Sequence, residues 1–164
     1  MKTFSSAAAT WATATIAALT LAACGEAQGE RQILRVVSGH VMVPATPDRP
    51  AAGYFTVEGG SAPVDLVAVT ADLAQRVEMH QTVKEDGMTS MRELRAAPVP
   101  VQGKLEFKPG GNHLMIWNIN GAAVRAGRLP MVFIFSNNER IVFDLKIKTA
   151  EDAAKGGGDA HAGH

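Results

Sequence analysis

The chain has 164 residues, of which 46% are hydrophobic and 20% charged, and its 16 basic residues balance its 16 acidic residues. This length suits one domain with appended terminal segments. The balanced charge argues against a nucleic-acid-binding protein, which would need a basic face. The single cysteine excludes an intrachain disulfide framework, a cysteine-rich zinc module and an iron–sulfur cluster. The sequence also lacks the glycine-rich motifs of nucleotide-binding proteins and the G-x-S-x-G motif of α/β-hydrolases.

Residues 1–23 have the features of a secretory signal peptide. Lys2 is the only charge, an uncharged Ala/Thr-rich run follows it, and small residues end the segment. The alternative is an uncleaved membrane helix, since the uncharged run is nearly long enough to span a bilayer. Its threonines and serines make the run poorly apolar, which favours the signal peptide.

The end of this segment, Leu21-Ala22-Ala23-Cys24, resembles the lipobox of bacterial lipoproteins, in which the cysteine is lipidated and becomes the mature N-terminus. The alternative is an unmodified cysteine in an ordinary signal. Because the only cysteine stands where a lipobox requires it, we expect a lipid anchor at Cys24. The protein is then held in the bacterial cell envelope, facing the periplasm, on either the inner or the outer membrane.

The rest of the chain is predicted to be one β domain, residues 33–148, between a linker (24–32) and a disordered, histidine-containing tail (149–164). No stretch has a convincing helical period, and short apolar runs alternate with turn residues, which predicts an all-β antiparallel sandwich or Greek-key barrel. The expected strands are Ile33–Met42, Gly53–Glu58, Val64–Thr70, Arg76–Thr82, Ser90–Ala96, Lys104–Lys108, His113–Ile119, Pro130–Ser136 and Arg140–Lys148.

Two of these strands carry spacings that suit a metal site. His113 and Met115 are separated by one residue, so both side chains lie on the same face of a strand. His80 and Met91 flank a predicted two-residue turn at 86–87, which places His80 opposite Glu93 and makes Met91 its diagonal neighbour on one face.

The same hairpin register turns the other nearby methionines away from this face. It places Met79 opposite Leu94 on the apolar side, so that Met79 and Met88 are predicted to be core or loop residues. Spacing alone does not decide whether the pairs His80/Met91 and His113/Met115 are metal ligands. The alternative is that they are ordinary residues, because a methionine on a strand is usually a core residue and a histidine is usually a surface residue.

Two imidazoles and two thioethers form a neutral and soft donor set. Thioethers are poor ligands for Ca²⁺, Mg²⁺ or Zn²⁺ but suit Cu(I). A blue-copper electron-transfer site would need a cysteine thiolate, and Cys24 is assigned to the N-terminus. An enzyme is not expected, because protein fills all four positions around the ion, whereas catalytic metals keep one position open.

The run His80-x10-Met91-x21-His113-x-Met115 resembles the H-x10-M-x21-H-x-M motif of the periplasmic copper chaperone family PCuAC, and the similarity extends over about residues 33–148. The resemblance implies a cupredoxin-like β-sandwich that binds one Cu(I) through these four residues. It also implies delivery of copper toward the CuA centre of cytochrome c oxidase, together with Sco-type thiol proteins.

Two parts of the sequence depart from the family pattern, and His40 lies far from the motif. Residues 42–47 replace an aromatic-x-Arg that commonly precedes Thr-Pro, and Trp117 replaces a second, non-ligand methionine. We expect Trp117 to lie on the strand face of His113 and Met115, either near the ion or as a packed core residue. His40 is interpreted as a surface or satisfied core histidine.

The tail offers Asp159, His161 and His164 as an auxiliary Cu(II) site, because oxygen and imidazole donors suit Cu(II), or it is a nonfunctional solvated end. Two further functions remain open. One is copper sequestration or resistance by the same four ligands, and the other is a metal-free structural lipoprotein.

Overall fold

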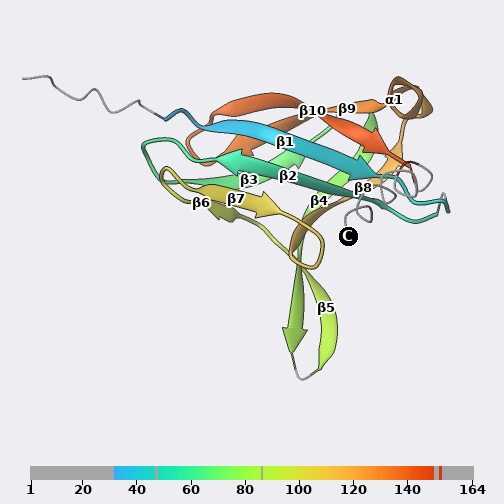
Figure 1. The fold of residues 1–164 in the computed structure, drawn as a ribbon, viewed down its shortest axis with the longest axis horizontal. Coiled ribbons are helices and arrows are strands. Elements are labelled where there is room, and N and C mark those ends of the chain that lie inside the picture. The colour runs from blue at the N-terminus through green and yellow to red at the C-terminus, as the bar shows by residue number, and fades with distance from the viewer. Residues whose placement is uncertain (1–31, 47, 86, 150–151, 153–164) are drawn as a thin grey trace, which may run out of the picture.

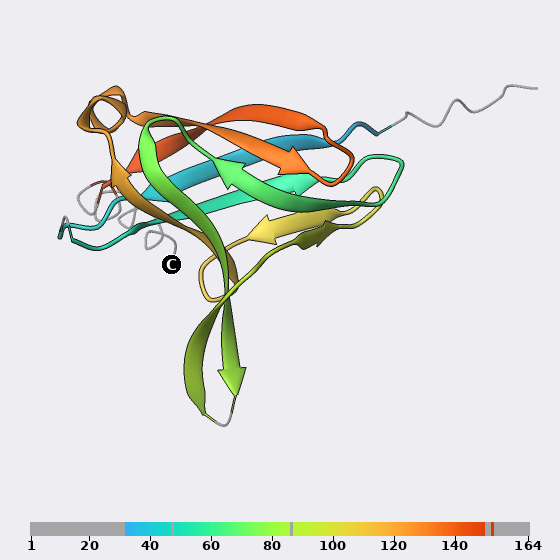
Figure 2. The same cartoon turned by 180° about the vertical axis from the view of Figure 1, so that it is seen from behind.

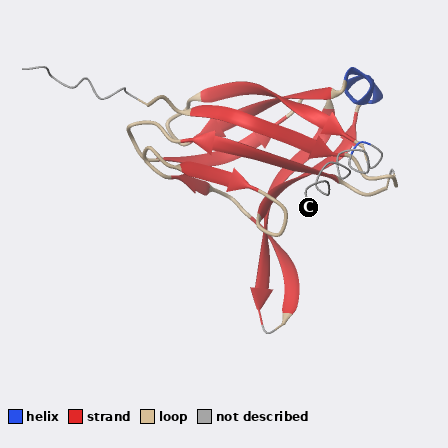
Figure 3. Ribbon diagram, viewed as in Figure 1, coloured by secondary structure: helices blue, strands red, loops and turns tan. Residues whose placement is uncertain are grey.

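The computed structural model describes residues 32–46, 48–85, 87–149 and 152 (Figure 1). Within them the chain forms ten strands and one short helix, so the all-β prediction is confirmed (Figure 3). The elements are β1 (Arg35–Met42), β2 (Ala51–Glu58), β3 (Val64–Thr70), β4 (Ala74–Glu85), β5 (Met88–Glu93), β6 (Ala97–Val99), β7 (Lys104–Phe107), β8 (Asn112–Ile119), α1 (Gly121–Ala126), β9 (Arg128–Phe135) and β10 (Arg140–Lys148).

The strands form one continuous sheet in the order β5-β4-β8-β2-β1-β10-β9-β3-β6, with β7 paired to β2. This sheet folds over into two layers with the apolar core between them (Figures 1 and 2). Every strand pair is antiparallel except β1 with β10, which run parallel. The predicted sandwich is therefore confirmed as an architecture, with one parallel pair that the alternation of residues could not reveal.

The core is built from residues at alternate positions along the strands, whose side chains face inward. In β2, every second residue from Ala51 to Val57 is buried, and the intervening residues face outward. Three phenylalanines meet at the centre: the ring of Phe55 stacks on Phe107 at 4.3 Å between centroids and meets the edge of Phe133 at 4.8 Å. Aromatic contacts of this kind add to the free energy gained by burying apolar area.

Two elements are missing from the predicted set. β6 has only three residues and contains Pro98, and α1 has six residues of mostly Gly and Ala, so neither carries a readable period. The helix does have terminal signals, since the Asn120 side chain accepts a hydrogen bond from the Ala122 amide and Gly127 adopts the left-handed conformation that ends a helix.

The β4–β5 hairpin projects beyond the sandwich as a separate arm (Figure 2). Its two strands begin and end differently from the prediction: β4 is longer at both ends, and β5 occupies 88–93 instead of 90–96. The register is nevertheless as predicted, with His80 opposite Glu93 and Thr82 opposite Met91. A two-residue turn fixes the pairing even where the strand ends are uncertain from sequence.

The predicted signal peptide, the lipobox cysteine and the histidines of the tail lie outside the described residues. No helix among the residues that the structure describes is long and apolar enough to span a bilayer.

Candidate metal site

The four predicted ligands lie on one outward face of three neighbouring strands. In β8, Leu114 and Ile116 are buried, so His113 and Met115 project from the opposite face. β8 pairs with β4 so that His113 stands directly opposite His80, and β4 pairs with β5 so that Met91 is diagonal to His80. Opposed residues of an antiparallel pair share a face, so the β5-β4-β8 register brings the four side chains to one surface.

Three of the four residues line one surface pocket of about 480 Å³, namely Met91, His113 and Met115. His80 lies beside this pocket, with its ring centre 6.1 Å from that of His113. A metal-bound imidazole nitrogen lies about 2 Å from the ion, and the ring centre about another ångström beyond. The separation between the two ring centres is therefore compatible with both rings binding one ion.

Hydrogen bonds fix the protonated nitrogen of each imidazole. His80 Nε2 lies 2.9 Å from a Glu78 carboxylate oxygen, and His113 Nδ1 lies 3.0 Å from the Gly111 carbonyl oxygen. Because a carbonyl and an ionised carboxylate only accept hydrogen bonds, each of these ring nitrogens carries the proton and donates it. The free lone pairs are then on Nδ1 of His80 and Nε2 of His113.

The free nitrogen of His80 is also buried. Its Nδ1 is the one buried side-chain nitrogen or oxygen atom among the described residues that has no hydrogen-bond partner. An unpaired buried polar atom costs free energy, so its presence in a folded protein calls for an explanation such as an ion. In the part of the chain that the structure describes, no three His, Cys, Asp or Glu side chains are arranged to hold a metal. The candidate donor set consists of the two imidazoles and the two thioethers that share this sheet face.

Glu78 is a site residue that sequence reasoning missed. It stands opposite Met115 in the β4–β8 pair, and its carboxylate lies between His80 and the guanidinium of Arg76, whose Nε is 3.3 Å away. A hydrogen-bonded carboxylate behind a ligating histidine fixes the ring orientation and makes the imidazole more basic. Its position two residues before His80, on the same strand face, was the available signal.

The structure separates the methionines as the hairpin register predicts. Met79 is buried in the core at 6% exposure, and its carbonyl accepts a hydrogen bond from the Leu94 amide. Met91 is 62% exposed on the face of His80, while Met88 is exposed on the opposite face near the hairpin tip. Of the three, only Met91 shares a face with the two histidines.

Trp117 lies on the predicted face of β8 but has a different neighbour from the expected one. It stands opposite Arg76, whose guanidinium carbon is 4.0 Å from the centre of the indole ring. Trp117 lines a pocket with Gln75 and Arg76 that is separate from the pocket of His113. The cation over this ring is thus an arginine, which also contacts Glu78.

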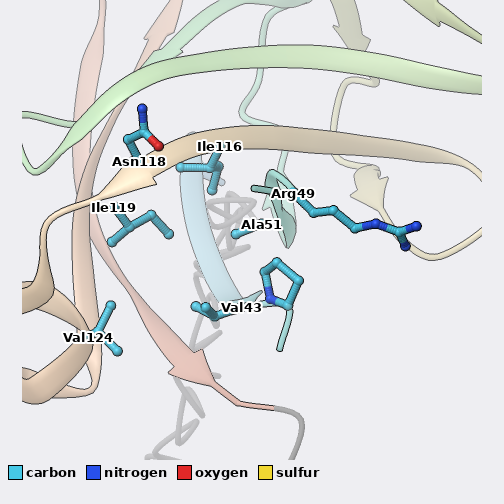
Figure 4. A pocket seen from close by; sticks show the side chains of 8 residues that line it. Val43, Arg49, Ala51, Ile116, Asn118, Ile119 and Val124 are labelled. Carbon is cyan, nitrogen blue, oxygen red and sulfur yellow. The ribbon is translucent and has the colours of Figure 1, made fainter. Parts of the chain in front are cut away.

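Two other features flank the site. His40 on β1 is half-buried, with its ring centre 5.4 Å from that of Tyr54. A pocket of about 370 Å³ opens between the β1–β2 loop and α1, lined mainly by apolar side chains such as Val43, Ile119 and Val124 (Figure 4).

Solved structures with a similar fold include PCuAC domains. A copper-bound PCuAC domain from PmoF2 superposes with a TM-score of 0.58 at 16% identity, covering 73% of this chain and 95% of that domain. An apo PCuAC domain from PmoF1 gives 0.55 at 21% identity, covering 73% and 97%. Apo-DR1885 from Deinococcus radiodurans gives 0.52 at 19% identity, covering 88% and 98%. The predicted resemblance to PCuAC proteins is thus confirmed in the fold.

Two curated relatives are similar to part of this chain, and a family model gives the family. Uncharacterized protein RP573 of Rickettsia prowazekii (strain Madrid E) is 25% identical over 100 residues, which is 59% of this chain and 55% of that protein. Putative lipoprotein Lxx21020 of Leifsonia xyli subsp. xyli (strain CTCB07) is 25% identical over 90 residues, 54% of each chain. The matches thus span about half the length of these relatives. The model described as "Putative lipoprotein LpqE-like" matches residues 34–147, and the chain therefore belongs to the LpqE-like lipoprotein family.

Proposed function

We propose that this protein is a copper chaperone that carries one Cu(I) on His80, Met91, His113 and Met115. The observation that carries the proposal is the convergence of these side chains on one sheet face, with one nitrogen free on each imidazole. Thioether sulfur and neutral imidazole suit Cu(I) better than they suit hard divalent cations. The fold shared with a copper-bound PCuAC domain supports the same cargo.

The site is suited to transfer rather than catalysis. Four protein donors leave no coordination position for a substrate, unlike a catalytic metal site. Met91 is highly exposed on a projecting hairpin, so a receiving protein can approach the ion from that side. We propose that copper passes toward the CuA centre of cytochrome c oxidase, in cooperation with a Sco-type thiol protein.

The terminal segments complete the proposal. Lipidation at Cys24 would hold the domain at a membrane, facing the periplasm. The description of the family as lipoproteins supports the lipid anchor. Asp159, His161 and His164 in the tail would collect Cu(II) separately from the main site.

An anaerobic Cu(I) titration in the presence of a chromophoric chelator tests the cargo. We expect one tightly bound Cu(I) per chain, with affinity falling as the pH is lowered because a protonated imidazole cannot ligate. Transfer to the apo CuA domain of cytochrome c oxidase then tests the recipient. Tight binding without transfer would indicate sequestration, and no stoichiometric binding would leave a metal-free structural role.

The methionines provide a matched test of the register. Met91→Leu removes a thioether from the site and should weaken Cu(I) binding at least about tenfold, or about 1.4 kcal/mol. Met79→Leu and Met88→Leu make the same chemical change off that face and should leave the Cu(I) affinity within about twofold of the wild type. Equal losses for Met79→Leu and Met91→Leu would contradict the assigned ligand set.

Glu78 gives a second test, of ligand positioning. Glu78→Ala removes the acceptor that holds the His80 ring and should weaken Cu(I) binding by roughly ten- to a hundredfold. Glu78→Gln retains a carbonyl acceptor without the charge and should recover most of that loss. Competition titrations against the same chelator measure both variants. An affinity unchanged in Glu78→Ala would show that the carboxylate does not position His80.

Trp117 should report on the metal through its neighbours. Contacts connect the indole to Arg76, Arg76 to Glu78, and Glu78 to His80. Trp11 lies in the predicted signal peptide, so Trp117 is the only tryptophan of the mature chain. Its fluorescence should change on anaerobic addition of Cu(I) or Ag(I), with a one-to-one endpoint. Arg76→Gln should reduce the response while stoichiometric binding persists, and an equal response in that variant would exclude this route.

A further inference from the structure

A further pocket, of about 380 Å³, lies on the same side of the sheet as the proposed copper site. We call it the lysine pocket, because Lys108, Lys146 and Lys148 line it together with His40 and Tyr54. The hydroxyl-bearing residues Ser38 and Thr56 complete its polar wall. No acidic side chain is among its lining residues in the described part of the chain.

The positive charge of this pocket is largely uncompensated. Lys108 pairs with Glu106 at 3.1 Å, but no described carboxylate lies within ion-pair distance of Lys146 or Lys148. Burial and the nearby charge of Lys148 lower the pKa of His40, so this imidazole is neutral at pH 7 and adds a polar group without charge. In a chain of zero formal net charge, such a group of lysines is a local excess.

The lysine pocket adjoins the pocket of the proposed ligands. Tyr54 lines both pockets, and the β7–β8 turn contributes Lys108 to one and Gly110 to the other. The strand pairing connects the two pockets across one face of the sheet. Met115 is opposite Ala52 on β2, and Tyr54 follows two residues later on the same face. Tyr54 is opposite His40 on β1, and His40 is beside Lys146 on β10. A protein that approaches the copper ligands therefore also meets the lysines.

We propose that the lysine pocket docks the copper-receiving protein through carboxylates that border the acceptor site of that protein. This inference rests on the proposed function and names the charge of the partner. Complementary charge beside a transfer site accelerates encounter and fixes orientation, with rate effects of roughly 10- to 1,000-fold at low salt. The pocket is lined by Ser38, Gly39 and His40 in the middle of β1, and its lysines Lys146 and Lys148 lie beside His40 and Met42, toward the end of β1 away from Arg35, where the segment from Cys24 joins the domain. This placement favours a protein over the lipid headgroups of the anchoring membrane.

The first experiment measures docking without copper. A fluorescent hexaglutamate peptide is titrated at about 20 mM ionic strength into the wild type and into Lys146→Glu, Lys148→Glu and Arg140→Glu. Arg140 is the matched control, since it faces outward on the same strand about 26 Å from Lys148. We expect binding by the wild type and by Arg140→Glu, and at least about tenfold weaker binding by both lysine variants. Absence of binding by the wild type, or equal loss in Arg140→Glu, would overturn the docking site.

The second experiment measures the rate of Cu(I) transfer to the apo CuA domain by stopped flow. The lysine variants should transfer at least about tenfold more slowly than the wild type and Arg140→Glu at about 20 mM ionic strength, and equally fast at about 500 mM. Their equilibrium Cu(I) affinity should be unchanged. If the lysine variants transfer Cu(I) as fast as the wild type at about 20 mM ionic strength, the inference is overturned. No transfer by the wild type would instead overturn the proposed recipient, and the peptide titration then decides the docking site.

Binding to anionic vesicles tests the alternative that the lysine pocket contacts lipid headgroups instead of a protein. With Cys24→Ser to remove the anchor, loss of binding to phosphatidylglycerol vesicles in the lysine variants, with unchanged peptide binding, would assign the pocket to a membrane surface and overturn the docking proposal.

Discussion

A His113→Ala/Met115→Ala double variant should lose stoichiometric Cu(I) binding, with the affinity falling at least about a thousandfold, or about 4 kcal/mol. Both donors project from one face of β8, and only the two donors of the projecting hairpin remain after the change. Loss of either donor alone leaves three and should weaken binding without abolishing it. Competition against a chelator of known Cu(I) affinity, under anaerobic conditions, measures the difference.

The control for this variant uses the same residue types elsewhere in the chain. His40→Ala/Met88→Leu also removes one imidazole and one thioether, but from positions outside the proposed ligand set. Its Cu(I) affinity should stay within about twofold of that of the wild type. Equal losses in the two double variants would show that copper binds through dispersed surface donors.

Phe133→Ala should have the largest effect on the fold. Its ring is fully buried and meets the edge of Phe55 across the core, so truncation removes apolar burial and leaves a cavity. The expected loss of unfolding free energy is about 3–5 kcal/mol, a large part of the 5–15 kcal/mol typical of a domain. Val142→Ala, at a 68% exposed position on β10, is the control and should change stability by less than about 0.5 kcal/mol. Urea unfolding followed by far-UV circular dichroism compares them, and similar midpoints would contradict the described core.

The hairpin and the strand β8 could be predicted from sequence because local rules determine them. The turn that the sequence predicts at residues 86–87 specifies which residues of β4 and β5 face one another, and strand alternation places His113 and Met115 on one side. The distance of 6.1 Å between the His80 and His113 rings depends instead on the β4–β8 register. That pairing joins segments about 30 residues apart, and no turn signal specifies it.

Other features depend on tertiary contacts or on short segments. The role of Glu78 appears only when β4 lies beside β8 and the carboxylate meets both His80 and Arg76. The stacking of Arg76 on Trp117 follows from the same pairing, so the sequence indicated the face of the indole but not its neighbour. Helix α1 is too short to show a hydrophobic period, and its caps, Asn120 and Gly127, are identified only in the structure.

The methionines of the site show why a motif needs a register. Met79, Met88 and Met91 are close in sequence and identical in chemistry, and the β4–β5 pairing alone distinguishes a core residue, a residue near the tip and a candidate ligand. The lysine pocket, by contrast, gathers residues from β1, β7–β8 and β10 that no local pattern connects. The sequence therefore predicted that the candidate ligands share one face, but it did not predict the lysine pocket beside them.

X-ray absorption at the copper K-edge, on the protein loaded anaerobically with one equivalent of Cu(I), tests the central claim most directly. The account predicts a Cu(I) edge and a first shell of two nitrogen and two sulfur neighbours, with one sulfur lost in Met91→Leu and none lost in Met79→Leu. A first shell of nitrogen and oxygen alone, or a shell that keeps both sulfurs in Met91→Leu, would contradict a site built from His80, Met91, His113 and Met115.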